Sequence, residues 1–247
     1  TILSWLAAHP SCEGIAISAP GYVDPHSGFI TMGGAIRRFD NFAMKSWLET
    51  RTGLPVSVEN DANCVLLAER WQGKAAEMAN FLVLTIGTGI GAGAIQNGEF
   101  IGGISHAEMG HMFVKRHPDD LDFAGVCPYH GDCLEGVAAG PSLEARTGIR
   151  GENIELDSNV WDIQAYYVAQ AAVSTTLTLR PEKIIFGGGV MSHDHMIARV
   201  RKHFQVLLND YIPTPPLEDY LQLTSIANNG SATLGNFALA LEALRSV

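Results

Sequence analysis

The feature that most constrains the fold is an apolar strand that leads directly into a glycine-rich turn. FLVLTIGTGIGAGAI (residues 81–95) predicts a buried strand, a glycine turn over 87–91 and a second strand. KIIFGGGV (residues 183–190) predicts another buried strand that enters a glycine turn. The dipeptide Asn97-Gly98 is typical of a tight hairpin turn after the second strand.

Helices are expected between these strands. Gly53 and Gly73 mark the ends of two of them, and Ser158 is a candidate N-cap for a third. Further strands are expected at 14–20 and 54–58, and helices at 42–50, 61–72, 158–179 and 231–247. Because strands alternate with helices, the sequence predicts an α/β fold.

Composition and charge exclude several classes of protein. Of the 247 residues 47% are apolar and 17% are charged, which is typical of a folded chain rather than a disordered one. The formal net charge is −10, whereas nucleic-acid binding needs clustered Lys and Arg. The sequence contains no apolar run of about 18 residues, so no membrane span is predicted. The first ten residues lack a basic leader. We therefore expect a cytoplasmic protein with neither a nucleic-acid nor a membrane partner.

Two cysteines and two histidines have the spacing of a metal site. Cys127, His130 and Cys133 form a Cys-x2-His-x2-Cys segment, and His111 lies upstream of it. Two sulfur and two nitrogen ligands suit tetrahedral Zn²⁺, and four protein ligands leave no open position for water. The pattern therefore predicts a structural zinc ion that orders a long irregular segment over 102–136.

Other interpretations of the cysteines and histidines stay open at this point. The cluster can instead consist of free thiols and surface histidines, and His117 or His106 can replace His111 as the fourth ligand. Cys12 and Cys64 lie far from the cluster in sequence, and we expect both to be buried free thiols.

A polar segment follows the strand expected at 54–58. Glu59, Asn60 and Asp61 stand between this strand and the next helix, and ligand sites in α/β sheets favour the carboxyl ends of strands. Asp61 can accept the proton of a substrate hydroxyl during phosphoryl transfer, and Asn60 can orient that hydroxyl. The alternative is that Asp61 only caps the following helix.

The two glycine turns have the composition of phosphate- and nucleotide-binding turns. Glycines let backbone N–H groups approach an anion closely, and Thr88 adds a hydroxyl donor. Neither a Walker loop nor a dinucleotide fingerprint is present. Plain tight turns are the alternative, but two such turns in one α/β chain favour a nucleotide cleft. The residues concerned are Gly87, Thr88, Gly89, Gly91, Gly187, Gly188 and Gly189.

Two carboxylates flank the candidate metal ligands. Glu108 precedes His111, and Glu135 follows Cys133. Acidic groups that a metal loop holds in place can bind sugar hydroxyls in a fixed pattern. The alternative is that both are ordinary solvated charges.

The order of five motifs resembles that of a known family. ENDAN (59–63), GTGIGAG (87–93), HAEMGH (106–111), CPYHGDCLEG (127–136) and GGGV (187–190) follow one another as in the ROK family of bacterial sugar kinases. The stretch over 110–146 is especially similar to the zinc-containing fructokinase branch. The resemblance implies an actin-like (ribonuclease H-like) ATPase fold, in which two lobes around a cleft close on ATP and a sugar. It also implies transfer of the γ-phosphoryl group of Mg²⁺-ATP, usually to the sugar 6-hydroxyl.

The resemblance also assigns roles to individual residues. It implies that Asp61 is the general base, that the turn over 87–91 binds phosphate and that the turn over 187–189 binds adenosine. The implied sugar contacts are Asn60, Glu108, His111, Glu135 and Gly21 of the SAPG turn. The implied zinc ligands are His111, Cys127, His130 and Cys133.

The resemblance further predicts the division into lobes. We expect residues 1–75 in a small lobe, to which the final helix over 231–247 returns, and residues 76–230 in a larger lobe. Family kinases begin with a hairpin that carries an Asp-x-Gly-Gly-Thr-Lys phosphate loop, and this motif is absent from these residues. We therefore expect a fragment or a truncated product, which puts the activity of this chain alone in question. The family resemblance suggests a homodimer.

The substrate is less constrained than the reaction. The ENDAN segment is closer to glucokinases and glycoside kinases, whereas the second half of the chain resembles fructokinases. We expect phosphorylation of D-fructose to fructose 6-phosphate. The alternatives are a kinase for glucose, mannose or an N-acetylated amino sugar, and a non-catalytic sugar-binding regulator of the same family.

Overall fold

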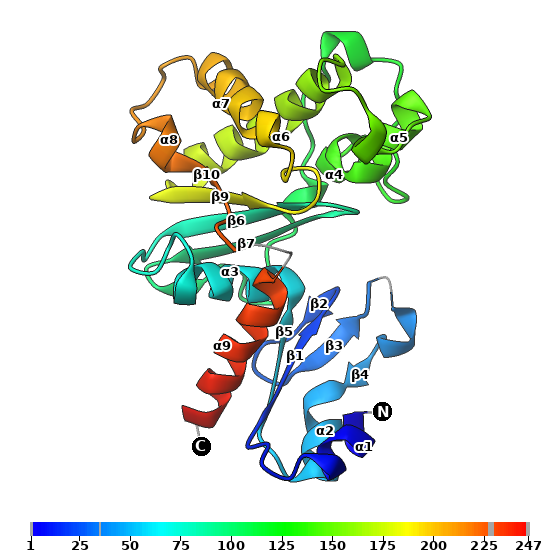
Figure 1. Ribbon diagram of the computed structural model, residues 1–247, viewed down its shortest axis with the longest axis vertical. Helices are drawn as coiled ribbons and strands as arrows, with labels where there is room; N and C mark the ends of the chain where they lie inside the picture. The colour runs from blue at the N-terminus through cyan, green and yellow to red at the C-terminus, as the bar shows by residue number, and fades with distance from the viewer. Residues whose placement is uncertain (1, 35, 227–229, 246–247) are drawn as a thin grey trace. The chain divides into compact units, whose positions relative to one another are not determined.

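The computed structural model describes residues 2–34, 36–226 and 230–245. The chain divides into two compact units (Figure 1). Unit 1 comprises Thr1–Ala76, Gly102–His106 and Ile226–Val247, and unit 2 comprises Glu77–Ile101 and Ala107–Ser225. Strands and helices alternate along the chain, so the predicted α/β class is confirmed.

Two small sheets are formed by the part of unit 1 that the structure describes. Strand β1 (Ile15–Ala19) pairs in parallel with β5 (Val56–Asn60), and Ala19 lies opposite Asn60 at the carboxyl ends of both strands. The second sheet is antiparallel, in the order β2 (Tyr22–Val23), β3 (Phe29–Met32) and β4 (Phe42–Ala43). The sequence did not predict these three strands, because runs of two to four residues are too short to show a periodicity.

The described residues of unit 1 also form four α-helices and a short 3-10 helix over Arg37–Phe39. The α-helices are α1 (Ile2–Ala8), α2 (Met44–Thr52), α3 (Asp61–Gln72) and α9 (Ser231–Arg245). The predicted extent of α3 is confirmed, and so is the helix end at Gly53, where φ is 68°. Helix α2 begins later than predicted because β4 occupies its first expected residues.

Helix α9 returns to the first part of the chain and packs against α3, β1 and β5. Gly235 of α9 faces the carbonyl oxygen of Cys64 in α3, where a methyl group would overlap that oxygen. The two helix backbones can therefore approach closely only with glycine at this position. Leu67 and Leu239 are among the buried side chains that fill the contact.

Unit 2 is built on one five-stranded sheet in the order β10-β9-β6-β7-β8. The bounds are β6 (Phe81–Ile86), β7 (Ile90–Gln96), β8 (Glu99–Phe100), β9 (Lys183–Gly187) and β10 (Leu221–Leu223). β6 is parallel to β9 and antiparallel to β7. The predicted hairpin turn joins β7 to β8, since φ is 54° at Asn97 and 84° at Gly98.

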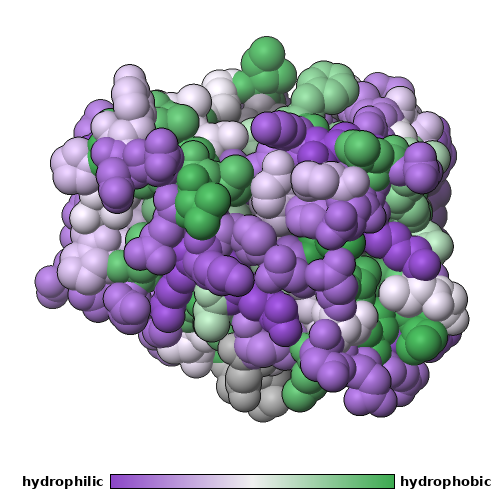
Figure 2. All heavy atoms as spheres, turned by 90° about the horizontal axis from the view of Figure 1, so that it is seen from above, coloured by the Kyte–Doolittle hydropathy of each residue, from purple (hydrophilic) through white to green (hydrophobic). Residues whose placement is uncertain are grey.

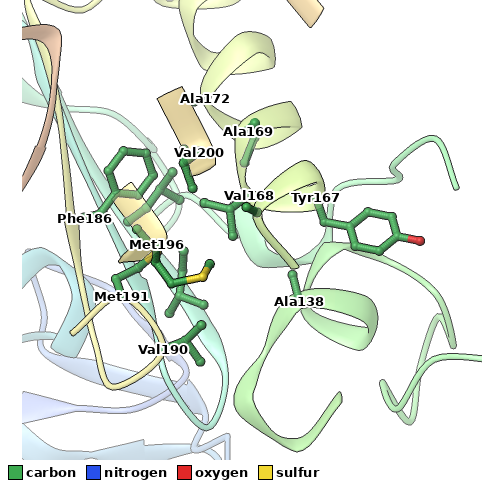
Figure 3. Packing of buried hydrophobic residues seen from close by; sticks show 14 of the residues in the cluster. Ala138, Tyr167, Val168, Ala169, Ala172, Phe186, Val190, Met191, Met196 and Val200 are labelled. Atoms are coloured by element: carbon green, nitrogen blue, oxygen red, sulfur yellow. The ribbon is translucent and has the colours of Figure 1, made fainter. Parts of the chain in front are cut away.

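The helices of unit 2 lie on one side of this sheet (Figure 1). They are α4 (Leu134–Ala138), α5 (Gly140–Thr147), α6 (Val160–Thr178), α7 (Asp194–Leu208) and α8 (Leu217–Tyr220). Phe186 of β9 and Val200 of α7 point toward Val168 and Ala172 of α6 in a buried core (Figure 3). The N-cap of α6 is Asn159, not Ser158, and its side chain makes no capping hydrogen bond.

The described helices are all too short or too polar to cross a membrane. The face drawn in Figure 2 is mostly hydrophilic, and its hydrophobic side chains form small separate groups. All four cysteines are free thiols. Cys64 is buried as expected, whereas Cys12 is only half-buried, so the expectation for Cys12 was wrong.

Candidate functional site

The two glycine turns lie together at one edge of the sheet in unit 2. β6 and β9 are parallel neighbours, and Thr85 lies opposite Gly187 where both strands end. A Cβ atom at Gly87 would lie 3.9 Å from the backbone nitrogen of Gly189. The two turns are therefore neighbours within one unit.

The first turn presents fewer outward donors than its glycines suggest. The N–H of Gly87 donates to the carbonyl of Gly89 at 2.9 Å, within the turn itself. Gly91 is part of β7 and lies opposite Thr85 in the β6–β7 ladder. Thr88 is exposed and Gly89 is half-buried, so their N–H groups and the Thr88 hydroxyl are the candidate phosphate donors.

The second turn requires glycine for reasons of backbone geometry. Gly188 has a φ of 88°, and a methyl group there would overlap the carbonyl of Ile86. Gly189 has open space around its Cα and is exposed to solvent. A close approach of a ligand to the backbone is therefore possible at Gly189, whereas Gly188 serves the turn itself.

The predicted metal ligands form a compact cluster in unit 2. One ligand atom from each of His111, Cys127, His130 and Cys133 lies within 4.8 Å of the other three. Nδ1 of His111 is 3.7 Å from the sulfur of Cys127 and 3.5 Å from that of Cys133. Tetrahedral zinc bonds of about 2.3 Å to sulfur and about 2.0 Å to nitrogen would place such atoms about 3.5 Å apart. The donor set and its spacing therefore fit a zinc ion.

The loop that carries the cluster is ordered by its own backbone. Cys127 and Gly131 exchange two backbone hydrogen bonds of 3.0 and 3.1 Å, which closes a small turn around His130. Burial raises the pKa of the Cys133 thiol to about 11. A bound cation would offset the unfavourable ionisation of this thiol, because it stabilises the thiolate form.

Neither alternative ligand lies in the cluster. His117 caps a short 3-10 helix, where its Nδ1 accepts a hydrogen bond from the N–H of Asp119 at 3.1 Å. His106 belongs to unit 1, and its ring lies 5.9 Å from that of Tyr22.

Sequence reasoning missed a buried ion-pair network beside the metal loop. The carboxylate of Asp120 accepts two 2.8 Å hydrogen bonds from Arg146 and one of 2.8 Å from Tyr167. Burial opposes ionisation of Asp120, but these hydrogen bonds and the charges of Arg146 and Arg116 hold the pKa of its carboxyl below the ordinary value. Arg116 also donates to Asp132, next to the candidate ligand Cys133, at 3.0 Å. The network therefore supports the loop from the side of Asp132.

Glu135 joins the metal cluster to the first glycine turn. Its Oε2 accepts a 2.9 Å hydrogen bond from the backbone N–H of Ile90, and its Oε1 lies 4.0 Å from Nε2 of His111. Glu108 is half-buried at the start of the 3-10 helix over Met109–His111, and its carbonyl accepts from the N–H of His111 at 3.1 Å. The carboxylate of Glu135 therefore lies beside His111, whereas Glu108 contacts His111 through its backbone carbonyl.

The candidate base and its neighbours lie in unit 1. Asn60 is buried, its Oδ1 accepts from the N–H of Ala62 at 2.8 Å, and its Nδ2 donates to the carbonyl of Gly21 at 3.0 Å. Asn60 is thus the N-cap of α3, and the alternative that Asp61 is the cap is wrong. Asp61 is the first residue of the helix and is exposed.

Sequence reasoning named Glu59 in the polar segment but did not predict that it is buried. It is 5% exposed, and its Oε1 accepts from the N–H of Asn60 at 2.7 Å and from the side chain of Asn63 at 3.1 Å. Burial, together with the charge of Glu59, raises the pKa of the neighbouring Cys64 thiol to about 12. The available signal was a carboxylate directly after an apolar strand. Such a position predicts a buried charge with hydrogen-bond partners, since buried charges need partners.

Comparison with models of known protein families identifies the family. The sequence model described as the ROK family matches residues 4–243. The chain belongs to the ROK family. The predicted resemblance is therefore confirmed for nearly the whole length of the sequence.

Curated relatives of the chain are sugar kinases. It is 60% identical over 167 residues to a fructokinase of Streptococcus mutans, a match that covers 67% of this chain and 57% of that protein. It is 80% identical over 117 residues to a beta-glucoside kinase of Klebsiella pneumoniae, which covers 47% of this chain and 39% of that protein. The matched regions thus span only part of the length of these two relatives.

Solved structures agree with the family in their fold. The Lmo2764 protein of Listeria monocytogenes, described as a candidate N-acetylmannosamine kinase, has 36% identity and a TM-score of 0.80, over 99% of this chain and 84% of that one. A ROK family glucokinase of Streptomyces griseus, solved with glucose and AMPPNP, has 21% identity and a TM-score of 0.75, over 98% and 88%. The chain therefore has the actin-like ATPase fold, as predicted.

Proposed function

We propose that the complete gene product transfers the γ-phosphoryl group of ATP to a hydroxyl of a hexose, and that D-fructose is phosphorylated at its 6-hydroxyl. Membership of the ROK family and 60% identity to a fructokinase over 167 residues support a sugar kinase. We also propose that units 1 and 2 correspond to the two lobes of such a kinase.

The observation that carries this proposal is the juxtaposition at the sheet edge of unit 2. Two glycine turns lie side by side there, and Glu135 joins one of them to His111. We assign the phosphates of ATP, with their Mg²⁺, to the N–H groups of Thr88 and Gly89, because backbone N–H groups that approach closely bind anions. The adenosine is assigned to the turn over 187–189.

The sugar contacts are proposed residue by residue. Oε1 of Glu135 and Nε2 of His111 are 4.0 Å apart, a gap that a single sugar hydroxyl can bridge with two hydrogen bonds. Glu108, Asn60 and the Gly21 turn are proposed to complete the sugar contacts. Asp61 is proposed to accept the proton of the attacking hydroxyl, since phosphoryl transfer needs positioning and charge handling more than covalent help.

We assign a structural zinc ion to the cluster of His111, Cys127, His130 and Cys133. Four protein ligands close the coordination shell, so the ion would hold the loop and the orientation of His111 rather than bind substrate. The S···N spacings of 3.5 to 3.8 Å support this assignment.

A second candidate substrate is a β-glucoside. The identity of 80% to a beta-glucoside kinase over 117 residues favours it, because this value exceeds the 60% identity to the Streptococcus mutans fructokinase. An N-acetylated amino sugar is a further candidate, because the Lmo2764 protein is structurally similar over 99% of this chain.

A substrate panel tests the proposal. The complete gene product is assayed for sugar-dependent ADP release with fructose, glucose, mannose, N-acetylmannosamine and cellobiose, against a control without sugar. We expect the highest kcat/KM with fructose. A higher value with cellobiose would favour the second candidate, and no sugar-dependent release with any of the five would contradict a kinase.

A further inference from the structure

We propose that Glu135 is a positioning residue that couples the metal cluster to the glycine turn over 87–91, so that metal occupancy sets the affinity of this turn for nucleotide. The nucleotide part of this inference rests on the proposed function. The coupling itself concerns only residues of unit 2 and can be tested without any substrate.

The first half of the coupling is the contact between Glu135 and the turn. Oε2 of Glu135 accepts the N–H of Ile90 at 2.9 Å, and it would lie 2.8 Å from a Cβ atom at Gly89. Hydrogen bonds to an ionised carboxylate are stronger than neutral ones. This carboxylate therefore holds the turn next to the two candidate phosphate donors, the N–H groups of Thr88 and Gly89.

The second half is the contact between Glu135 and the metal ligands. Nδ1 of His111 faces the sulfur atoms of Cys127 and Cys133, so Nδ1 is the nitrogen placed to bind a metal. The other nitrogen, Nε2, would then carry the proton and face Oε1 of Glu135, which lies 4.0 Å away. A metal-bound histidine commonly donates its second N–H to a carboxylate in this way, directly or through water.

The covalent chain supplies a second link between the same partners. Cys133 is the N-cap of α4, and Glu135 is the second residue of that helix. A metal bound to Cys133 would therefore fix the start of the helix that carries Glu135. Since α4 has only five residues, it has few hydrogen bonds of its own to hold that position.

A role for Glu135 in sugar binding alone predicts a different behaviour. In that case, removal of the metal or of the carboxylate would weaken sugar binding and leave the glycine turn unchanged. The distinguishing observable is therefore the protection of the Ile90 amide, measured in the absence of both sugar and nucleotide.

The test combines metal removal with substitution of Glu135. Hydrogen exchange of the Ile90 amide and equilibrium binding of Mg²⁺-AMPPNP are measured for the wild type, Glu135→Ala and Glu135→Gln, each with zinc and after chelation. Glu144→Gln is the matched control, because Glu144 is an exposed glutamate on the neighbouring helix α5. Circular dichroism verifies that each chelated protein is folded at the temperature of the experiment.

We expect chelation to reduce the protection of Ile90 in the wild type and to weaken AMPPNP binding by about 5-fold or more. Glu135→Ala should show both losses with zinc bound, and chelation should then add little. Glu135→Gln keeps an acceptor for Ile90 but loses the charge that faces His111. Glu135→Gln should therefore retain most of the protection of the Ile90 amide, but this protection should depend little on bound metal. Glu144→Gln should behave as the wild type.

Equal effects of chelation in the wild type and in Glu135→Ala would overturn the coupling, and so would an unchanged Ile90 amide. Metal-dependent protection without any AMPPNP binding would instead contradict the proposed kinase function and keep the coupling. If a chelated protein does not fold, the zinc affinity is measured by chelator competition with and without AMPPNP. Linkage requires the nucleotide to tighten zinc binding in the wild type and not in Glu135→Ala.

Discussion

The side-chain amide of Asn60 donates a hydrogen bond of 3.0 Å to the carbonyl oxygen of Gly21. The same side chain caps α3 through the N–H of Ala62. Asn60 thereby fixes the turn after β1 and the first turn of α3 to each other. Asp61, the proposed base, is the next residue along the chain, so its backbone is held from both sides.

Replacement of Asn60 should therefore affect stability. Asn60→Ala loses the cap and the bond to Gly21, and we expect the free energy of unfolding to fall by about 2 kcal/mol. Urea denaturation measures this change. The exposed Asn153 provides the control, since Asn153→Ala should change the value by less than about 0.5 kcal/mol. Equal effects of the two substitutions would argue against the bridging role.

The buried carboxylate of Asp120 should stabilise unit 2. Asp120→Asn leaves the buried Arg146 without a carboxylate partner and leaves Arg116 paired with Asp132 alone, and we expect a loss of about 3–5 kcal/mol in the free energy of unfolding. The control is Asp119→Asn, since Asp119 is the adjacent exposed carboxylate.

The same carboxyl predicts a pH dependence. Because the folded state lowers the pKa of Asp120, its contribution is fully present above its unfolded pKa of about 3.9 and is lost as the pH falls through the folded value. The wild type should therefore lose stability more steeply below about pH 4 than Asp120→Asn does. Parallel acid-denaturation profiles for the two proteins would refute this assignment.

The metal cluster predicts a dependence of stability on zinc. Cys133→Ser should abolish zinc binding, whereas Cys12→Ser should not, because Cys12 lies outside the cluster. Chelation should lower the Tm of the wild type and of Cys12→Ser, because a metal that binds only the folded state adds its binding free energy to folding. Elemental analysis and thermal melts measure both effects, and a wild-type protein purified without zinc would contradict the assignment.

The second glycine turn offers a matched pair of substitutions. Gly188→Ala forces a residue with a side chain into a φ of 88° against the backbone of Ile86. We expect the free energy of unfolding to fall by about 3 kcal/mol or more, since backbone strain and overlap both contribute. Gly189→Ala meets open space and should leave the free energy of unfolding nearly unchanged. Thermal denaturation compares the two, and equal Tm values would show that the turn does not require glycine at 188.

Local signals predicted much of this fold and site from sequence. Glycine stops and apolar runs delimited α3 and β6, and the close spacing of three ligands indicated the metal cluster. Contacts between distant parts of the chain could not be found in this way. Asp120 and Arg146 are 26 residues apart, and Ile90 and Glu135 are 45 apart, so no periodicity or motif pairs them.

One misassignment was local. Asn60 and Asp61 are both good N-cap residues, and propensity does not distinguish them. β5 extends to Asn60 because that residue pairs with Ala19 of β1, and this pairing sets the start of the helix. The cap was therefore decided by a strand partner that is distant in sequence.

The most direct test of the proposed function is the turnover number of the Asp61→Asn variant. In the complete gene product, with the preferred sugar and saturating Mg²⁺-ATP, kcat should fall by a factor of about 10² to 10⁴. The free energy of unfolding should change by less than about 1 kcal/mol, because Asp61 is exposed and does not cap α3. The exposed Asp157 serves as the control, and Asp157→Asn should retain full activity. A kcat near that of the wild type in Asp61→Asn would contradict the account.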